Sequence, residues 1–297
     1  MLVHLNGRLV PREEAAVSPL DRGFLFGDGL YEGLRTTEGV VIGLDLHIKR
    51  MREGLEETRL DRADQAFNPD RLEELTVELI RANGLTEAFV YWQVTRGAPG
   101  PADPVRQRLP SPGMRPTVFG YAVAAAPVAS FREPETKSAA LIRDSRWERG
   151  HVKGISMLGN VIAAMDAAES GAEDAILHRN GVVTEGTSTN VVIVPRGASH
   201  AVTPSLASAP MLAGVTRALL LEADPTLEER PVTVDEIRAA DEIMLIGTLT
   251  MLVSVVQLDG RPVGPVSHSG RPGSHARRLL GTLVEAIRRD VHSHRRH

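Results

Sequence analysis

Residues 151–190 constrain the fold of this chain more than any other segment. The apolar residues of the stretch 158–170 have helical spacing, and Gly171 follows them, so a helix that ends at this glycine is predicted. Asn180-Gly181 then separates two short apolar runs and supplies the positive φ angles of a type I′ turn. A helix followed by a β-hairpin is therefore expected. The strands of this hairpin are expected at 174–178 and 182–184.

Two side chains that could take part in catalysis flank these elements: Lys153 precedes the helix, and Glu185 follows the hairpin. A lysine is by default a solvated surface residue. Lys153, however, lies in a stretch with few other charges, just before an apolar helix. A partly desolvated lysine is a good nucleophile toward an aldehyde. Gly186, next to Glu185, lets the backbone approach a ligand closely. The two residues are therefore the first candidates for a functional site.

Composition and charge exclude several other classes of protein. The formal net charge is −4, whereas a protein that binds a phosphate backbone is normally basic. The chain has no cysteine, which excludes disulfides and thiolate metal sites and is compatible with a reducing compartment. No signal peptide is recognisable, and the apolar runs are shorter than a membrane span. A cytoplasmic protein without a metal, nucleic acid or membrane partner is expected.

The remaining patterns indicate two domains. We expect a smaller N-terminal α/β domain at 1–122, an interdomain linker at 123–135 and a larger C-terminal domain at 136–297. Asp45 is predicted to cap the first long helix, and the glycine-rich segment 18–29 is predicted to be a loop. In the first domain, strands are expected at 1–10 (with a turn at Asn6-Gly7), 31–37, 40–44, 89–95 and 116–126, and helices at 45–58 and 69–83. In the second, further strands are expected at 138–142, 191–194, 242–247 and 252–258, and helices at 211–221, 234–239 and 273–292.

The segment around Lys153, the run Thr184-Glu-Gly-Thr-Ser-Thr-Asn190 and the run Asp21-Arg-Gly-Phe-Leu-Phe-Gly-Asp-Gly29 together resemble the class IV aminotransferases, and the resemblance covers essentially the whole chain. It implies an α+β enzyme of fold type IV, with a β-barrel-like core in the larger domain, pyridoxal 5′-phosphate (PLP) as cofactor and a homodimer. It also implies that Lys153 forms a Schiff base with PLP and moves the proton. Glu185 would keep the pyridine nitrogen protonated, so that the ring accepts electrons.

The same resemblance assigns further site residues. A phosphate group needs positive charge and free backbone N–H groups, and short hydroxyl side chains can bind the cofactor as well. The implied cofactor-binding residues besides Glu185 are Arg50, Ser188, Thr189, Val215, Thr216 and Thr248. The implied substrate-binding residues are Tyr31, Arg96, Arg106, Arg108 and Thr250, and Arg146 is a further candidate to line the site.

The identity of the substrate stays open between three members of this family. The stretches 91–97 and 175–181 are similar to the D-amino-acid aminotransferases, whereas 31–35 is closer to the branched-chain enzymes. The Arg-x-His pair that usually binds the substrate carboxylate in the D-amino-acid group is absent, and Arg106 and Arg108 are its expected substitutes. We expect a transaminase that uses a D-amino acid such as D-alanine and a 2-oxo acid such as 2-oxoglutarate. The alternatives are a branched-chain L-amino-acid aminotransferase, aminodeoxychorismate lyase, or a phosphate-ligand-binding protein that has lost turnover.

Overall fold

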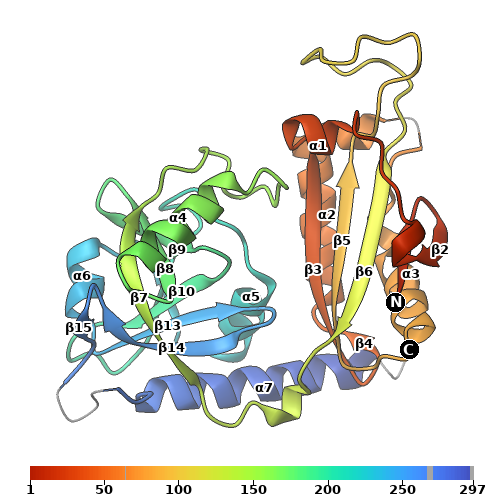
Figure 1. The fold of residues 1–297 in the computed structure, drawn as a ribbon. Coiled ribbons are helices and arrows are strands. Elements are labelled where there is room, and N and C mark those ends of the chain that lie inside the picture. Colours follow the sequence, from red (N-terminus) through yellow and green to blue (C-terminus); the bar gives the residue numbers. More distant parts are fainter. Residues whose placement is uncertain (64, 266–269, 295–297) are drawn as a thin grey trace. The chain divides into compact units, whose positions relative to one another are not determined.

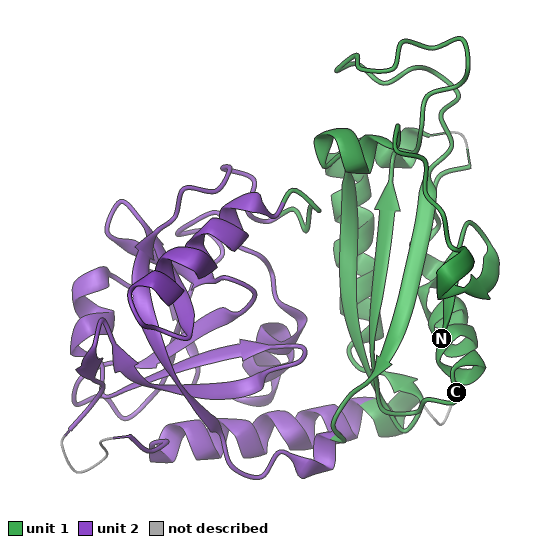
Figure 2. Ribbon diagram, in the orientation of Figure 1, with its two compact units in different colours: residues 1–127, 152–156, 291–297 green, residues 128–151, 157–290 purple. Residues whose placement is uncertain are grey.

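The computed structural model describes residues 1–63, 65–265 and 270–294, which form two compact units (Figure 2). Unit 1 contains residues 1–127, the short segment 152–156 and the end of the chain from Val291. Unit 2 contains residues 128–151 and 157–290. Lys153 therefore groups with the N-terminal unit, although it follows the predicted linker in sequence.

Unit 1 is built on an antiparallel sheet of six strands, in the order β2-β1-β6-β5-β3-β4, with helices α2 and α3 packed on it (Figure 1). Its strands are β1 (Leu2–Leu5), β2 (Arg8–Pro11), β3 (Gly29–Thr37), β4 (Val40–Val41), β5 (Ala88–Thr95) and β6 (Thr117–Ala124). Its helices are α1 (Arg22–Phe26), α2 (Leu44–Glu57) and α3 (Leu72–Ala82), with single 3₁₀ turns at Arg12–Glu14, Leu60–Arg62 and Pro69–Arg71.

The core of unit 1 follows from the alternation of side chains along its strands. Even-numbered residues of β3 and β5, such as Leu34 and Trp92, are fully buried and pack against Met51 of α2 and Leu79 of α3. The indole Nε1 of Trp92 donates a hydrogen bond of 2.9 Å to Thr76 on α3, so its polar atom is satisfied inside the core. The odd-numbered residues, among them Tyr31, lie on the opposite face of the sheet.

Unit 2 contains a sheet of nine strands, in the order β12-β11-β10-β13-β14-β7-β8-β9, with β15 paired to β14. Its strands are β7 (Glu135–Arg143), β8 (Asp174–Arg179), β9 (Val182–Gly186), β10 (Asn190–Val194), β11 (Val202–Pro204), β12 (Glu228–Arg230), β13 (Glu242–Gly247), β14 (Met251–Leu258) and β15 (Arg261–Pro262). Its helices are α4 (Leu158–Glu169), α5 (Val215–Ala223), α6 (Val234–Ala239) and α7 (Ser274–His294), with a 3₁₀ turn at Val128–Ser130; the part of α7 from Val291 groups with unit 1.

This sheet curls on itself. Strand β9 is the last strand of the path and β10 the third, yet only residues 187–189 join them. Gly186 N–H donates to the carbonyl of Thr189 at 2.7 Å and closes this connection. The two strands can be neighbours in sequence and distant in strand order only if the sheet bends back, which gives the barrel-like core that the resemblance implied.

Two local predictions differ from the structure. Asp45 does not cap α2: Gly43, in the left-handed conformation at φ 62°, is the N-cap residue, and Asp45 lies in the first turn. The predicted loop 18–29 contains helix α1, because Asp21 accepts the N–H of Gly23 and caps it, and Gly27 ends it in the left-handed conformation.

Helix α4 packs on the sheet through small side chains. Its large apolar side chains are exposed, and Ala163 and Ala167 are the residues that pack on the sheet. The exposed residues are Leu158, Val161, Ile162 and Met165. Within the described residues, no helix is both long enough and apolar enough to cross a membrane.

Candidate active site

The segment that carries Lys153 lies along strand β3. The N–H of Tyr31 donates to the carbonyl of Lys153 at 3.0 Å, and the N–H of Ile155 donates to the carbonyl of Gly29 at 3.1 Å. The Nζ atom of the half-buried Lys153 lies 4.2 Å from the centroid of the Tyr31 ring, within cation–π range. The backbone of the lysine is thus fixed to a strand, and its amine lies over an aromatic face.

A buried charged cluster lies on the opposite face of β3. Arg50 on α2 donates from Nε to Oε1 of Glu32 at 2.8 Å and from Nη2 to Oε2 at 2.6 Å. Nδ1 of His47 is 2.7 Å from the same Oε2 atom. Burial alone would raise the pKa of Glu32, but the Arg50 charge and the hydrogen bonds from Arg50 and His47 hold it well below its usual range. The carboxylate therefore fixes the guanidinium of Arg50 in one orientation.

A second charged cluster holds Glu185 in unit 2. Oε1 of Glu185 accepts Nη1 of Arg146 at 2.6 Å, and Oε2 accepts the backbone N–H of Leu212 at 3.1 Å. Arg146 also binds Asp144, through Nε at 3.0 Å and Nη2 at 2.9 Å. Burial opposes the charge of Arg146, but Asp144 and Glu185 raise its pKa well above the ordinary value, so the guanidinium stays charged.

The start of helix α5 leaves backbone donors available. Its N-cap residue, Gly214, makes no side-chain cap, so the first N–H groups, including those of Val215 and Thr216, have no capping side chain. A Cβ atom at Gly214 would lie 1.9 Å from Oδ1 of Asn190 on β10, which only glycine avoids. The beginning of α5 is therefore held close to the start of β10.

Hydroxyl side chains gather at the same ends of strands β10, β13 and β14. A Cβ atom at Gly247 would lie 3.3 Å from Cγ2 of Thr189 and 3.7 Å from Oγ1 of Thr250, so the segments 187–189 and 248–250 are adjacent. Oγ1 of Thr189 is buried and has no hydrogen-bond partner. An unpaired buried hydroxyl is costly and calls for a ligand or water. Ser188, Thr189, Thr248 and Thr250 are thus brought together in unit 2.

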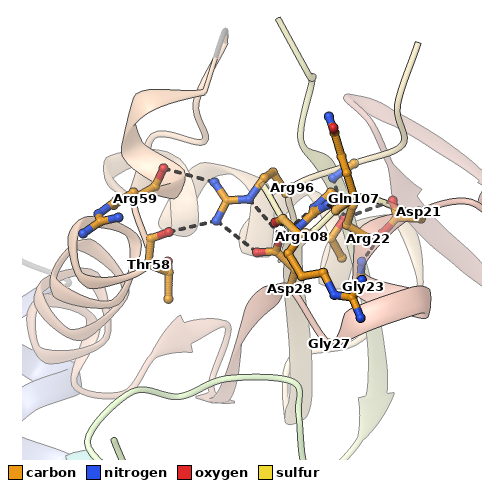
Figure 3. Close-up of polar contacts among 12 residues, drawn as sticks. Asp21, Arg22, Gly23, Gly27, Asp28, Thr58, Arg59, Arg96, Gln107 and Arg108 are labelled. Atoms are coloured by element: carbon orange, nitrogen blue, oxygen red, sulfur yellow. Dashed lines mark hydrogen bonds and ion pairs between the residues drawn. The ribbon is translucent and has the colours of Figure 1, made fainter. Parts of the chain in front are cut away.

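The substrate-side candidates of unit 1 fall into two groups. Tyr31 stacks on Tyr91 at a centroid distance of 5.5 Å, and Tyr91 stacks on Tyr121 at 5.2 Å. The other group belongs to the long loop between β5 and β6. Arg106 and Arg108 are exposed there, whereas the guanidinium of Arg96 binds both oxygens of Asp28 and the carbonyls of residues 58 and 59 (Figure 3).

Several of these residues were not found by sequence reasoning. Glu32 is a fully buried carboxylate on a strand whose even-numbered residues face the helices, and that alternation is the signal that would have found it. His47 and Arg50 share one face of α2 by their i, i+3 spacing. Asp144 and Asp28 carry no comparable sequence signal: each has an arginine nearby in sequence, Arg146 and Arg22, but neither pair has a periodic spacing that would mark it.

No group of three or more histidine, cysteine, aspartate or glutamate residues among 1–63, 65–265 and 270–294 is arranged to hold a metal ion. Residues 29–258, by contrast, match the family described as "Amino-transferase class IV". The chain belongs to the class IV aminotransferase family. It is an enzyme of fold type IV, as the resemblance implied.

Among curated relatives, this class IV aminotransferase is 35% identical over 299 residues to a D-alanine aminotransferase of Bacillus licheniformis, with 97% of each chain covered. It is 31% identical to a D-alanine aminotransferase of Staphylococcus haemolyticus, with 93% of this chain and 94% of the relative covered.

Among solved structures, a branched-chain aminotransferase from Thermoproteus uzoniensis, determined with norvaline, has a TM-score of 0.80 and 26% identity. The match covers 98% of this chain and 97% of that one. The T.th. branched-chain amino acid aminotransferase complexed with N-(5′-phosphopyridoxyl)-L-glutamate has a TM-score of 0.81 and 26% identity, with 96% of this chain and 93% of that one covered.

Proposed function

We propose that this class IV aminotransferase is a PLP-dependent transaminase that takes its amino group from a D-amino acid such as D-alanine and passes it to a 2-oxo acid such as 2-oxoglutarate. The observation that carries the proposal is the 35% identity to a D-alanine aminotransferase along 97% of both chains. The two branched-chain structures share 26% of their residues with this chain over a similar length, so that activity is the second candidate.

The residues present fit the cofactor. A phosphate group accepts hydrogen bonds from helix N-termini and hydroxyls, and unit 2 offers the uncapped start of α5 together with the unpaired hydroxyl of Thr189. We assign phosphate binding to Val215, Thr216, Thr248 and Arg50, and further cofactor contacts to Ser188 and Thr189. Bound PLP supplies an aldehyde that condenses with amines and a ring that withdraws electrons from the substrate α carbon.

The protein's own groups then have distinct tasks. Lys153 would hold the cofactor and would move the proton between the substrate α carbon and the cofactor C4′ atom. Glu185 keeps the pyridine nitrogen protonated, and Arg146 and the Leu212 N–H fix that carboxylate. Glu32 fixes the guanidinium of Arg50 through both of its carboxylate oxygens. Release of the 2-oxo acid before the second substrate binds makes the scheme ping-pong.

On the substrate side we assign Tyr31 and Thr250 to the neighbourhood of the reacting atoms, and Arg106 and Arg108 to the substrate carboxylate. Arg96 belongs to this side through its contact with Asp28, at the β5 end of the same loop. Guanidinium groups suit a carboxylate because they bind it in a bidentate manner.

We also propose that the enzyme is a homodimer of the cytoplasm. The exposed apolar residues of α4 support an interface, since monomers rarely expose large contiguous apolar patches. The absence of cysteine suits a reducing compartment. Light scattering of the purified chain at micromolar concentration tests the dimer, and a monomer mass would refute it.

The decisive experiment mixes the PLP-loaded protein separately with D-alanine and with L-leucine and follows the cofactor absorbance without any 2-oxo acid. A change with D-alanine alone supports the proposal, whereas a change with L-leucine alone makes the enzyme a branched-chain aminotransferase. If neither acts, release of pyruvate from aminodeoxychorismate without an acceptor would identify a lyase. Binding of PLP without any conversion would leave only a binding protein. The Lys153→Ala variant serves as the inactive control.

A further inference from the structure

The segment around helix α1 holds the long loop between β5 and β6 at its base. Oδ2 of Asp21 accepts the hydroxyl of Thr95, the last residue of β5, at 3.0 Å and that of Thr117, the first residue of β6, at 2.6 Å. The N–H of Arg22 donates to the carbonyl of Gly97 at 2.9 Å. One buried carboxylate thus ties together the two strand ends from which the loop emerges.

The side chain of Arg22 reaches the middle of the same loop. Its Nη1 donates to the carbonyl of Gln107 at 2.7 Å and its Nη2 to the carbonyl of Arg108 at 2.9 Å, while Nε donates to Asp28 at 2.7 Å (Figure 3). Arg22 is 7% exposed. A guanidinium is the only side chain that serves three acceptors in this planar arrangement. It fixes two successive peptide groups, from which the side chain of Arg108 projects.

Asp28 is itself held from the other side. Arg96 donates to its Oδ2 from Nε at 2.9 Å and to its Oδ1 from Nη2 at 3.0 Å, and Nη2 also binds the carbonyl of Thr58 at the end of α2. Burial opposes the charge of Asp28, but the hydrogen bonds and charges of Arg96 and Arg22 keep its pKa below the usual value. Arg22 is therefore anchored to an ionised group that is bound to the end of a core helix.

The loop side chains at the anchored segment carry positive charge without a carboxylate partner. Arg106 and Arg108 are exposed, and in the part of the chain that the structure describes neither forms an ion pair. The guanidinium carbon of Arg106 lies 6.0 Å from the ring centroid of Phe26, and that of Arg22 lies 4.7 Å from the same ring. The anchored segment thus presents two guanidinium groups from a fixed backbone.

We infer that Arg22 is a positioning residue for substrate binding: by holding the carbonyls of residues 107 and 108 it fixes Arg106 and Arg108 where they bind the substrate carboxylate. The inference rests on the proposed function, in which these two arginines bind that carboxylate. Arg22 itself makes no contact with the substrate. Its contribution is that the loop does not have to be ordered when the substrate binds, which lowers the free-energy cost of binding.

The test compares Arg22→Gln and Arg22→Lys with the wild-type holoenzyme and with Arg52→Gln. Arg52 is an exposed arginine of the same unit that pairs with Asp70 and serves as the matched control. Steady-state kinetics give KM and kcat for D-alanine. Trypsin digestion, followed by mass spectrometry, measures cleavage after Arg106 and Arg108 independently of activity. Arg115 is a poor trypsin site because Pro116 follows it, so the products are easy to assign.

We expect Arg22→Gln to raise KM about tenfold or more, the equivalent of losing about one charge-assisted hydrogen bond, with kcat changed much less. Loop cleavage should accelerate by a similar factor. The KM and the loop-cleavage rate of Arg22→Lys should lie between those of the wild type and Arg22→Gln, because an ammonium group keeps the charge beside Asp28 but cannot bind both carbonyls. If Arg22→Gln does not fold, the lysine variant carries the test. Arg52→Gln should leave both measurements unchanged.

An unchanged KM and unchanged loop cleavage in a folded Arg22 variant would overturn the inference. So would a fall in thermal stability and kcat without a rise in KM, which would indicate a role in the fold alone. Failure of the proposed function has a different result: wild-type protein would then show no reaction with D-alanine, and the trypsin comparison would still report the loop anchor.

Discussion

The two buried charged clusters pair a glutamate with an arginine in opposite ways. In unit 1 both oxygens of Glu32 are bound by Arg50, and His47 completes the group. In unit 2 Arg146 is shared between Asp144 and Glu185, and Glu185 binds it through Oε1. The carboxylate is the supporting partner in the first cluster, whereas the arginine is the supporting partner in the second.

Under the proposed function, this difference separates the charged group that would bind the cofactor from the group that only orients it. A carboxylate whose two oxygens are both engaged by one guanidinium serves to orient that guanidinium, as the Arg50 assignment requires. Glu185 instead binds the shared arginine through one oxygen and the N–H of Leu212 through the other, and it is the carboxylate that the proposed function pairs with a pyridinium. Replacing each glutamate in turn is therefore the strongest test of this comparison.

Replacement of Glu32, which orients Arg50, should have the largest effect on stability. Glu32→Gln removes the charge of the buried carboxylate that binds Nε and Nη2 of Arg50, so a loss of about 3–5 kcal/mol in the free energy of unfolding is expected. Affinity for PLP should fall with it. Denaturant unfolding and PLP titration measure the two effects, with Glu53→Gln, an exposed glutamate on the same helix, as the control. A variant as stable as the wild type would refute the supporting role.

Replacement of Glu185 should lower the turnover rate. We expect Glu185→Gln to lower kcat by about 100- to 1000-fold, the usual cost of removing one preorganised electrostatic contact. PLP should still bind. Single-turnover absorbance changes with D-alanine provide the measurement. If Glu185→Gln lost PLP while a saturated sample kept its kcat, the two glutamates would have the same role and the comparison would fail.

A conservative change of the shared arginine should have a smaller effect. Arg146→Lys keeps the positive charge but cannot bind Asp144 and Glu185 at once, so a fall in kcat of about tenfold is expected. The rate at saturating PLP is the quantity to measure. Asp144→Asn, which releases Arg146 from the other side, should give a fall of similar size. A rate equal to that of the wild type in both variants would show that Glu185 needs no support.

The smallest predicted effect is a dependence of stability on pH that arises from the cluster in unit 1. Burial, opposed by Glu32, lowers the pKa of His47 below 6.5, so the folded protein binds fewer protons here than the unfolded chain does. Stability should therefore fall as pH drops through 6.5, by at most about 1.4 kcal/mol per pH unit. His47→Gln should remove this slope between pH 7.5 and 5.5, and His200→Gln, an exposed histidine of unit 2, should not. Equal slopes in all three proteins would contradict the prediction.

The sequence predicted several elements in which local chemistry decides the backbone, although it missed the locally capped helix α1. Asn180 and Gly181 have φ angles of 53° and 81°, as the type I′ turn requires, because this dipeptide tolerates the left-handed conformation at both positions. Helix α4 was placed correctly, but its apolar side chains did not reveal which face packs. Alanines lie against the sheet, while Leu158 and Met165 are exposed, since close packing there favours small side chains.

The candidate site was predictable only in part. Lys153 and Glu185 stand out by residue type and by resemblance, and their roles remain proposals. The acidic residues that hold the arginines were missed: arginine partners of Asp28 and Glu32 lie 68 and 18 residues away, and Asp144 and Arg146, although two residues apart, form no pattern that marks them as a pair. Arg22 was quoted within a motif without a role, since the carbonyls that it binds are 85 and 86 residues away. Such contacts exist only once the chain has folded.

Contacts at the base of the β5–β6 loop allow the sequence of this loop to change independently of the sheet. Asp21 joins Thr95 to Thr117, and Gly97, at φ 85°, lies so close to the carbonyl of Arg115 that a Cβ atom would be 1.8 Å from it. Residues between these points can be inserted, deleted or exchanged at a cost that grows slowly with length. Under the proposed function, in which this loop binds the substrate carboxylate, a change of substrate would need a change in this loop alone, while the strands that support it stay as they are.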